Sequence, residues 1–231
     1  MRIVTNEPLV KRNALIGRYS LIGGTALLIG ALLINLLAFT RPNDTSLLFY
    51  VIAAFFVGFA LTNIGNLFNN RWGRRPDRGL AESLKGLDDR YALYNYRLGA
   101  AHVLAGPHGL VVLLPKHHYG PILYDGKRWH NPGGRRGMFG LFNADPLGNP
   151  ILEAAGEVEN FNRFVKKRGA RVEAVPQAAV VFLNTRAEIS AKEAPLPVLH
   201  FKQLKDFIRK LPKDAGFTPD ALDGLVDAPP A

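Results

Sequence analysis

"AHVLAGPHGLVVLLPKHHYGPI", residues 101–122, contains the pattern that decides the fold of the larger part of this chain. Two apolar runs, 102–105 and 110–115, are separated by Gly-Pro-His-Gly, a combination typical of a tight turn between strands. The second run ends at Lys116. A lysine at the end of a buried strand is costly unless it has a charged partner or a chemical role. The stretch thus predicts a β-hairpin whose second strand ends in a cation that needs an acid nearby.

The pattern around this hairpin predicts an α+β domain with a central mixed sheet flanked by helices. Asn149 and Pro150 form a helix start, and Gly169 marks a helix end. Pro115 lacks a backbone N–H, which favours an edge or strand-end position for the residues beside it. Further strands are expected at 91–98, 121–129, 178–183 and 198–200, and helices at 78–87, 150–168 and 201–211.

Two uncharged apolar stretches precede the domain, at about 19–40 and 46–68. A membrane-spanning helix needs about 20 mostly apolar residues, so both stretches are long enough. A signal peptide would have a shorter apolar region and no second span directly after it. Two transmembrane helices in a hairpin are therefore expected, with 41–45 as the turn. Ala26/Gly30 and Ala54/Gly58 are pairs of small residues spaced for close helix approach.

Basic residues on either side of these spans predict their orientation. They precede the first span and follow the second, so the positive-inside rule places both termini and the main domain in the cytoplasm, at the cell membrane. The expected organisation is an anchor at 1–70, a basic juxtamembrane linker at 71–78, the main domain at 79–211 and a flexible tail at 212–231. The basic residues concerned are Arg2, Lys11, Arg12, Arg18, Arg71, Arg74, Arg75 and Arg78.

Composition limits the chemistry. The chain has no cysteine, which excludes disulfides and thiolate metal sites. Its formal net charge is +10, and part of the excess lies in the main domain. Such an excess is compatible with nucleic acid as a partner but does not require one.

Residues 101–122 resemble the NERD (nuclease-related) domain family. Members show an Asp-His, an apolar run, Gly-Pro-x-Gly, and a second apolar run ending in Glu/Asp-x-Lys with a glycine shortly after. "GLAESLKGL" upstream and "RWHNP", "DPLGNP" and "VEAVPQAAVVFL" downstream are similar to other blocks of the family, so the resemblance covers about 79–211. The residues that coincide with the family pattern are His102, Gly106, Pro107, Gly109, Lys116 and Gly120.

The resemblance implies a restriction-endonuclease-like fold in which carboxylates hold Mg²⁺ and a lysine assists an attacking water. Here the family's two acids fall on Ala101 and Leu114, and its glutamine falls on Asn149. Lys116 and Glu82 are what remain of the implied catalytic set. Alanine and leucine cannot bind a hard cation, so the expectation is a degenerate site with no metal and no cofactor, Mg²⁺ being needed only if other acids substitute.

Asp125, Asp145 and Glu153 are candidates for that substitution because they lie near the site in sequence. A solvated turn or helix start is the favoured explanation of all three. His117 and His118 are adjacent on a strand and point to opposite faces, so they cannot share one metal. Lys116 itself is interpreted as either a strand-end lysine that reaches water or a remnant of the pocket.

Arg135 and Arg136 lie among glycines and are candidates for binding nucleic-acid phosphates. A solvated loop explains them as well.

Three functional hypotheses follow. The first is a membrane-anchored NERD-like protein without cleavage activity that binds nucleic acid or serves as a scaffold. The second is a divergent Mg²⁺-dependent nuclease that uses Glu82 with Asp145 or Glu153. The third is a partner of another membrane protein, with no role in nucleic-acid binding. The lipid bilayer is an expected partner in all three, and protein partners are not identified by the sequence.

Overall fold

The computed structural model describes residues 1–40, 45–132, 147–170, 172, 174–213 and 219–227. These residues fall into two compact units. The hairpin unit comprises Glu7–Arg75, and the sheet unit comprises Met1–Asn6, Pro76–Gly134 and Leu147–Ala231.

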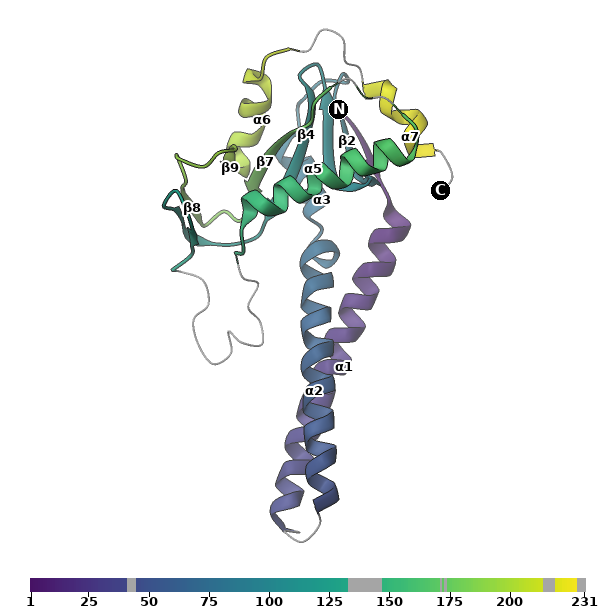
Figure 1. Ribbon diagram of the computed structural model, residues 1–231, viewed down its shortest axis with the longest axis vertical. Helices are drawn as coiled ribbons and strands as arrows, with labels where there is room; N and C mark the ends of the chain where they lie inside the picture. The colour runs from purple at the N-terminus through teal and green to yellow at the C-terminus, as the bar shows by residue number, and fades with distance from the viewer. Residues whose placement is uncertain (41–44, 133–146, 171, 173, 214–218, 228–231) are drawn as a thin grey trace. The chain divides into compact units, whose positions relative to one another are not determined.

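The hairpin unit is built from two long helices that pack against each other, α1 (Glu7–Thr40) and α2 (Thr45–Phe68) (Figure 1). A short π-helical segment, η1 (Asn69–Gly73), follows α2. Both long helices are long and apolar enough to cross a membrane, which confirms the predicted apolar pair. Many of their large apolar side chains are exposed, including Leu33 at 60 % and Phe39 at 80 %. A helix of a soluble core would bury such side chains, and lipid would cover them.

Glycines bring the two helices into close contact. A β-carbon added at Gly24 would lie 2.5 Å from Thr62 Oγ1 and 2.8 Å from the Gly58 carbonyl oxygen. Gly65 is equally crowded, with Leu21 N at 2.7 Å from its added β-carbon. Gly30 has no atom within 4 Å of such a carbon, so the Ala26/Gly30 pair does not form the contact that its spacing suggested, whereas Gly58 does.

Gly24→Leu should therefore separate the helices. Overpacking of a tight contact costs about 1–3 kcal/mol, and we expect that loss in the unfolding free energy of the full chain during titration from neutral detergent into SDS. Gly30→Leu is the matched control, since its new side chain meets open space. Equal losses in the two variants would contradict the packing described.

The sheet unit contains a six-stranded mixed sheet of order β1-β2-β3-β4-β7-β9 (Figure 1). Strands β2, β3 and β4 are antiparallel neighbours, whereas β1 is parallel to β2, and β7 is parallel to both β4 and β9. The α+β class with a mixed sheet is thus confirmed. The strands are β1 (Arg2–Thr5), β2 (Ala92–Leu98), β3 (Ala100–Gly106), β4 (Gly109–Lys116), β7 (Gln177–Phe182) and β9 (Val198–His200).

Strand β4 is an interior strand that is buried on both faces. Leu110 and Val112 pack with α5 (Pro150–Lys167) on one face, while Val111 and Leu113 pack with α3 (Pro76–Ser83) and α6 (Phe201–Lys210) on the other. A strand in this position needs a continuous apolar run instead of an alternating one, as the sequence shows.

The expectation that Pro115 lies on an edge strand is wrong, because β7 pairs with β4 as far as Lys116. The strand-end alternative holds on the β3 side, where the ladder stops at Val112.

Helix α5 begins as its sequence predicts. The Asn149 side-chain oxygen accepts hydrogen bonds from the backbone N–H groups of Ile151 and Leu152, at 3.2 and 3.4 Å, and Pro150 takes the first helical position. Gly169, with φ +63°, follows the helix end. A smaller sheet of order β6-β5-β8 is formed by β5 (Gly120–Tyr124), β6 (Trp129–His130) and β8 (Ala187–Ser190).

Both ends of the chain differ from the predicted organisation. Strand β1 lies in the main sheet, whereas the sequence analysis assigned residues 1–70 to the anchor. Of the predicted flexible tail, η2 (Pro219–Leu222) and α7 (Asp223–Asp227) are folded, with Leu222 and Leu225 buried in the core beside β2. The predicted linker at 71–78 is divided between η1 and the start of α3.

Arg2 and Asp223 connect these two ends. The Arg2 guanidinium donates hydrogen bonds to both Asp223 carboxylate oxygens, each at 2.8 Å, and the Tyr94 hydroxyl donates to Oδ1, also at 2.8 Å. Burial alone would raise the pKa of Asp223, but the hydrogen bonds from Arg2 and Tyr94 outweigh it and hold that pKa below its ordinary value.

A carboxylate with a lowered pKa stabilises the folded state above its unfolded pKa, about 3.9, and that contribution is lost as the pH falls through the folded value. We therefore expect the protection of the α7 amide protons, taken relative to their intrinsic exchange rate at each pH, to fall below about pH 4. Asp223→Asn should produce faster exchange at neutral pH and remove this pH dependence, while Asp206→Asn, on the exposed side of α6, serves as the control. Unchanged exchange in Asp223→Asn would contradict the role of the Arg2 pair.

Candidate functional site

Lys116 lies at the carboxyl end of β4, opposite Phe182 of β7. Its ammonium group donates to both carboxylate oxygens of Glu153, at 2.8 and 2.7 Å, and to the Leu147 carbonyl oxygen at 3.3 Å. Three acceptors match the three N–H donors of a lysine. The Lys116 side chain is 11 % exposed and that of Glu153 is 43 % exposed, so the pair is half-buried. Glu153 is the acid that accompanies the strand-end lysine.

The position of Glu153 follows from the local structure of α5. Asn149 caps the helix, and Glu153 lies in its first turn, where the helix dipole favours a negative charge. Since α5 covers the face of the sheet on which Lys116 lies, the first turn of the helix meets the end of β4.

Glu157, one helical turn further on, is a second acid that α5 directs at the sheet. It is buried, at 8 % exposure, and its Oε2 accepts the backbone N–H of Ala101 at 2.7 Å. This N–H lies where the β2–β3 register shifts, between Asn95 and Leu98, and beyond the β3–β4 ladder, which begins at Val103. A partly buried N–H outside the ladders needs another acceptor, and Glu157 supplies one.

The two strand positions that the family resemblance assigns to acids carry no side-chain oxygen here. Ala101 meets the carboxylate of Glu157 through its backbone, and Leu114 packs in an apolar cluster with Ile122 and Phe182. Both acids of this region therefore come from the helix. Glu153 was predicted only as a possible substitute and Glu157 was not predicted, although their four-residue spacing places both on one helix face.

Glu82 is not brought to Lys116. It is exposed on α3, while Leu80 of that helix and Leu84 directly after it are buried on the face of the sheet opposite α5. Asn149, at the position of the family's glutamine, is the α5 cap. Arg135, Arg136 and Asp145 lie outside the described residues, so their predicted roles stay predictions.

Asp125 has a structural role in the turn between β5 and β6. Its carboxylate accepts the backbone N–H groups of Arg128 and Lys127, at 2.7 and 2.9 Å, and contacts His130 Nε2 at 2.8 Å. These hydrogen bonds, that from Arg128 first, hold the pKa of Asp125 well below its ordinary value. Asp125 is therefore a turn residue, which is one of the two explanations that its sequence position allowed.

His102 also lies in a structural network. Its Nδ1 is 2.8 Å from Asn95 Oδ1, and Asn95 Nδ2 donates to Thr5 Oγ1 at 3.0 Å, which joins β1, β2 and β3. Among the residues that the structure describes, no three His, Asp or Glu side chains are grouped closely enough to hold a metal ion.

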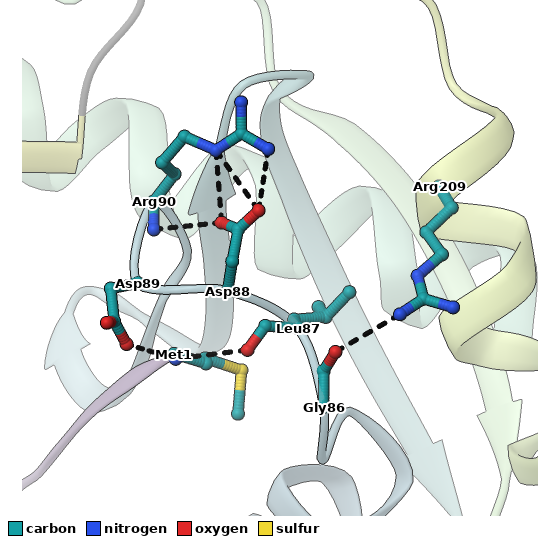
Figure 2. Close-up of polar contacts among 7 residues, drawn as sticks. All are labelled: Met1, Gly86, Leu87, Asp88, Asp89, Arg90 and Arg209. Carbon is teal, nitrogen blue, oxygen red and sulfur yellow. Dashed lines mark hydrogen bonds and ion pairs between the residues drawn. The ribbon is translucent and has the colours of Figure 1, made fainter.

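A second polar cluster surrounds the chain's first residue (Figure 2). The Met1 amino group donates to the Leu87 carbonyl oxygen at 3.2 Å and to Asp89 Oδ1 at 3.1 Å. Asp88 pairs with Arg90, which lowers the pKa of Asp88, and Arg209 donates to the Gly86 carbonyl oxygen at 3.1 Å. These contacts connect the segment between α3 and β2 with β1 and α6, which is a structural role.

Comparisons of this chain with protein-family models, curated proteins and solved structures found no match.

The Lys116–Glu153 pair predicts an asymmetric effect of mutation. Glu153→Gln leaves a nearly buried ammonium without its anion and should lower the unfolding free energy by about 1–3 kcal/mol. Lys116→Met should cost less, because the half-exposed Glu153 carboxylate regains water. Chemical denaturation of the full chain in detergent measures these losses. Adding the double variant Lys116→Met/Glu153→Gln completes a double-mutant cycle, which gives the interaction energy between the two side chains.

Glu159→Gln, which affects an exposed acid on the same helix, is the control and should change stability by less than about 0.5 kcal/mol. A larger loss from Lys116→Met than from Glu153→Gln would contradict this account of the pair.

Proposed function

We propose that this chain is a membrane-anchored protein whose NERD-like domain acts by binding and does not cleave nucleic acid. The observation that carries the proposal is the Lys116–Glu153 ion pair. In a metal-dependent nuclease the lysine must meet the attacking water or the phosphate, and carboxylates must be available to the metal. Here the lysine's donors and the carboxylate's two oxygens are engaged with each other.

The strand positions support the same conclusion. Ala101 and Leu114 offer no oxygen ligands, and one carboxylate, that of Glu153, is in contact with Lys116 among the residues described. Mg²⁺ is usually held by one or two carboxylates together with substrate phosphates, and here the one carboxylate already contacts the lysine. A restriction-endonuclease-like ancestry of the mixed sheet remains part of the proposal, since it comes from the family resemblance alone.

The anchor is the hairpin unit, and its orientation is inferred from charge. Lys11, Arg12 and Arg18 precede the first apolar segment, and Arg71 and Arg74 follow the second. The positive-inside rule then places the sheet unit in the cytoplasm, held at the cell membrane. Nucleic acid is the first candidate partner because the chain carries a formal charge of +10, and a protein partner is the alternative.

One observation favours a second candidate, a divergent nuclease. Glu153 and Glu157 lie one turn apart on α5 and meet the two neighbouring strands at Lys116 and Ala101. A metal held by this pair would replace the missing strand acids, with Glu153 released from Lys116.

A cleavage assay separates the two candidates. The full chain in neutral detergent is incubated with single- and double-stranded DNA and RNA and with Mg²⁺ or Mn²⁺. We expect no cleavage, together with binding whose affinity falls as salt is raised. Cleavage that disappears in both Lys116→Ala and Glu157→Gln, but persists in Glu159→Gln, would favour the nuclease. Absence of binding at low salt would exclude nucleic acid as the partner.

The Ala101→Asp/Leu114→Glu variant tests the ancestry. If the domain kept the geometry of the family site, restoring both strand acids should produce metal-dependent cleavage that requires Lys116. Because Glu153 competes for the same lysine, the triple variant that also carries Glu153→Gln should cleave faster. A correctly folded triple variant without activity would count against a nuclease-like origin of this site.

A further inference from the structure

Five exposed cations lie in a narrow zone at one end of the hairpin unit. We call them the basic belt, and they are Lys11, Arg12, Arg18, Arg71 and Arg74.

The level at which the belt begins is set by a helix contact. A β-carbon added at Gly17 would lie 2.9 Å from Phe68 Cβ and 3.1 Å from Asn69 N, so Gly17 of α1 and Phe68 of α2 are at the same height. From this level the apolar part of each helix continues for about 23 residues, or about 34 Å, which matches the hydrocarbon core of a bilayer. The Gly17–Phe68 contact therefore marks the boundary of the apolar region.

Four members of the belt lie beyond this boundary, and Arg18 lies one residue to its apolar side. Arg18 is adjacent to Gly17, while Lys11 and Arg12 precede Gly17 by about 8–9 Å of helix, and Arg71 and Arg74 follow Phe68 by a similar or smaller distance. The headgroup layer of one leaflet is about 5–8 Å thick. All five cations thus reach the depth of lipid headgroups.

Aromatic side chains mark the same level. Trp72 packs on Phe68, with ring centroids 4.9 Å apart, and the Arg71 guanidinium lies over the Trp72 ring at 5.3 Å. Tyr19, next to Arg18, is 67 % exposed. Tryptophan and tyrosine gather at the membrane–water interface, where one end of the side chain is apolar and the other is hydrated.

The acidic residue described in the hairpin unit is engaged outside the belt. Glu7 is the acidic residue among the described residues of the hairpin unit, and it pairs with Arg75, Oε1 to Nη2, at 2.7 Å. The π-helical turn of η1 carries Arg71 and Trp72 and is followed directly by Arg74, whose N–H bonds to the Asn69 carbonyl oxygen at 2.8 Å. The backbone that presents these cations is therefore hydrogen-bonded and ordered.

We infer that the basic belt binds the headgroups of anionic phospholipids. This inference rests on the proposed membrane anchor and adds a lipid preference to it. Phospholipid fits the belt better than nucleic acid does, because the cations lie within a few ångströms of the apolar boundary, where a bilayer's own phosphates are. Positive-inside topology requires only an excess of cations, whereas a belt at headgroup depth with interfacial aromatics also provides contacts to the lipid phosphates.

The test uses Trp72 as the reporter. The chain has two tryptophans, so Trp129→Phe leaves Trp72 as the single fluorophore in the full chain. Phosphatidylglycerol or phosphatidylcholine with identical acyl chains is titrated into neutral detergent micelles that contain the protein. We expect a saturable change in Trp72 emission whose midpoint is on the order of tenfold lower for phosphatidylglycerol, and which is reversed by about 1 M NaCl, where the Debye length is about 3 Å.

Variants locate the effect. The belt variant should lose the preference for phosphatidylglycerol; it carries Lys11→Gln/Arg12→Gln/Arg71→Gln/Arg74→Gln. The control variant removes as many exposed cations from the sheet unit and should keep the preference; it carries Lys166→Gln/Lys202→Gln/Lys210→Gln/Lys213→Gln. If the first variant does not fold, the comparison of the two lipids and the effect of salt on the parent chain still decide. The midpoint temperature of thermal unfolding of the unmodified chain should rise with phosphatidylglycerol and not with phosphatidylcholine. The same lipid preference in the unmodified chain shows that Trp129→Phe does not cause it.

Equal responses to the two lipids, an equal loss in both variants, or the same emission change with inorganic phosphate would each overturn the lipid site. The proposed anchor fails in a different way: the full chain would then stay monomeric and dispersed without detergent. A detergent-dependent chain that shows no lipid preference would therefore reject the basic belt and leave the anchor intact.

Discussion

The sheet unit depends on a cation that must be accommodated at the end of a strand buried on both faces. Residues Leu110 to Leu113 of β4 are at most 3 % exposed, and the strand is paired with β7 as far as Lys116. An ammonium group in this position would lose most of its hydration without compensation. The first turn of α5 provides the compensation through Glu153, so the packing of the helix and the neutralisation of Lys116 are satisfied by the same arrangement.

Helix α5 serves as the connection between several parts of the sheet. Glu153 holds the end of β4, and Glu157 accepts the N–H that the register shift of β2 leaves outside the ladders at Ala101. Phe161 and Val165, further along the same face, bury apolar area against β2, β3 and β4. Polar contacts thus position the first half of the helix and apolar contacts the second, and the four-residue spacing keeps all four side chains on one face.

Local patterns predicted the elements that have local causes. The cap at Asn149, the glycine after α5 and the unbroken apolar run of β4 led to the correct helix and strand. Strand β1 and helix α7 were missed because each is short and stabilised by partners far along the chain, Arg2 with Asp223 above all. The ion pair of the candidate site was not predicted for the same reason. Lys116 and Glu153 are 37 positions apart, and the sequence between them carries no sign that the two will meet. The loss of the family's acids at Ala101 and Leu114, in contrast, could be read directly from the residues.

The arrangement around Lys116 also limits what chemistry this region can perform. Glu153 contacts Lys116 through both carboxylate oxygens, so a metal ion bound there would compete with the lysine for the same oxygens, and once Glu153 turns toward a metal the lysine needs another anion. A substrate phosphate would be such an anion, so cleavage would require metal and phosphate to displace the ion pair together. If Glu157 turned toward the metal as well, the partly buried Ala101 N–H would lose the acceptor that Oε2 now provides. Each of these changes weakens a contact that positions α5 on the sheet. The proposed binding role, through surfaces outside this region, would require none of these changes.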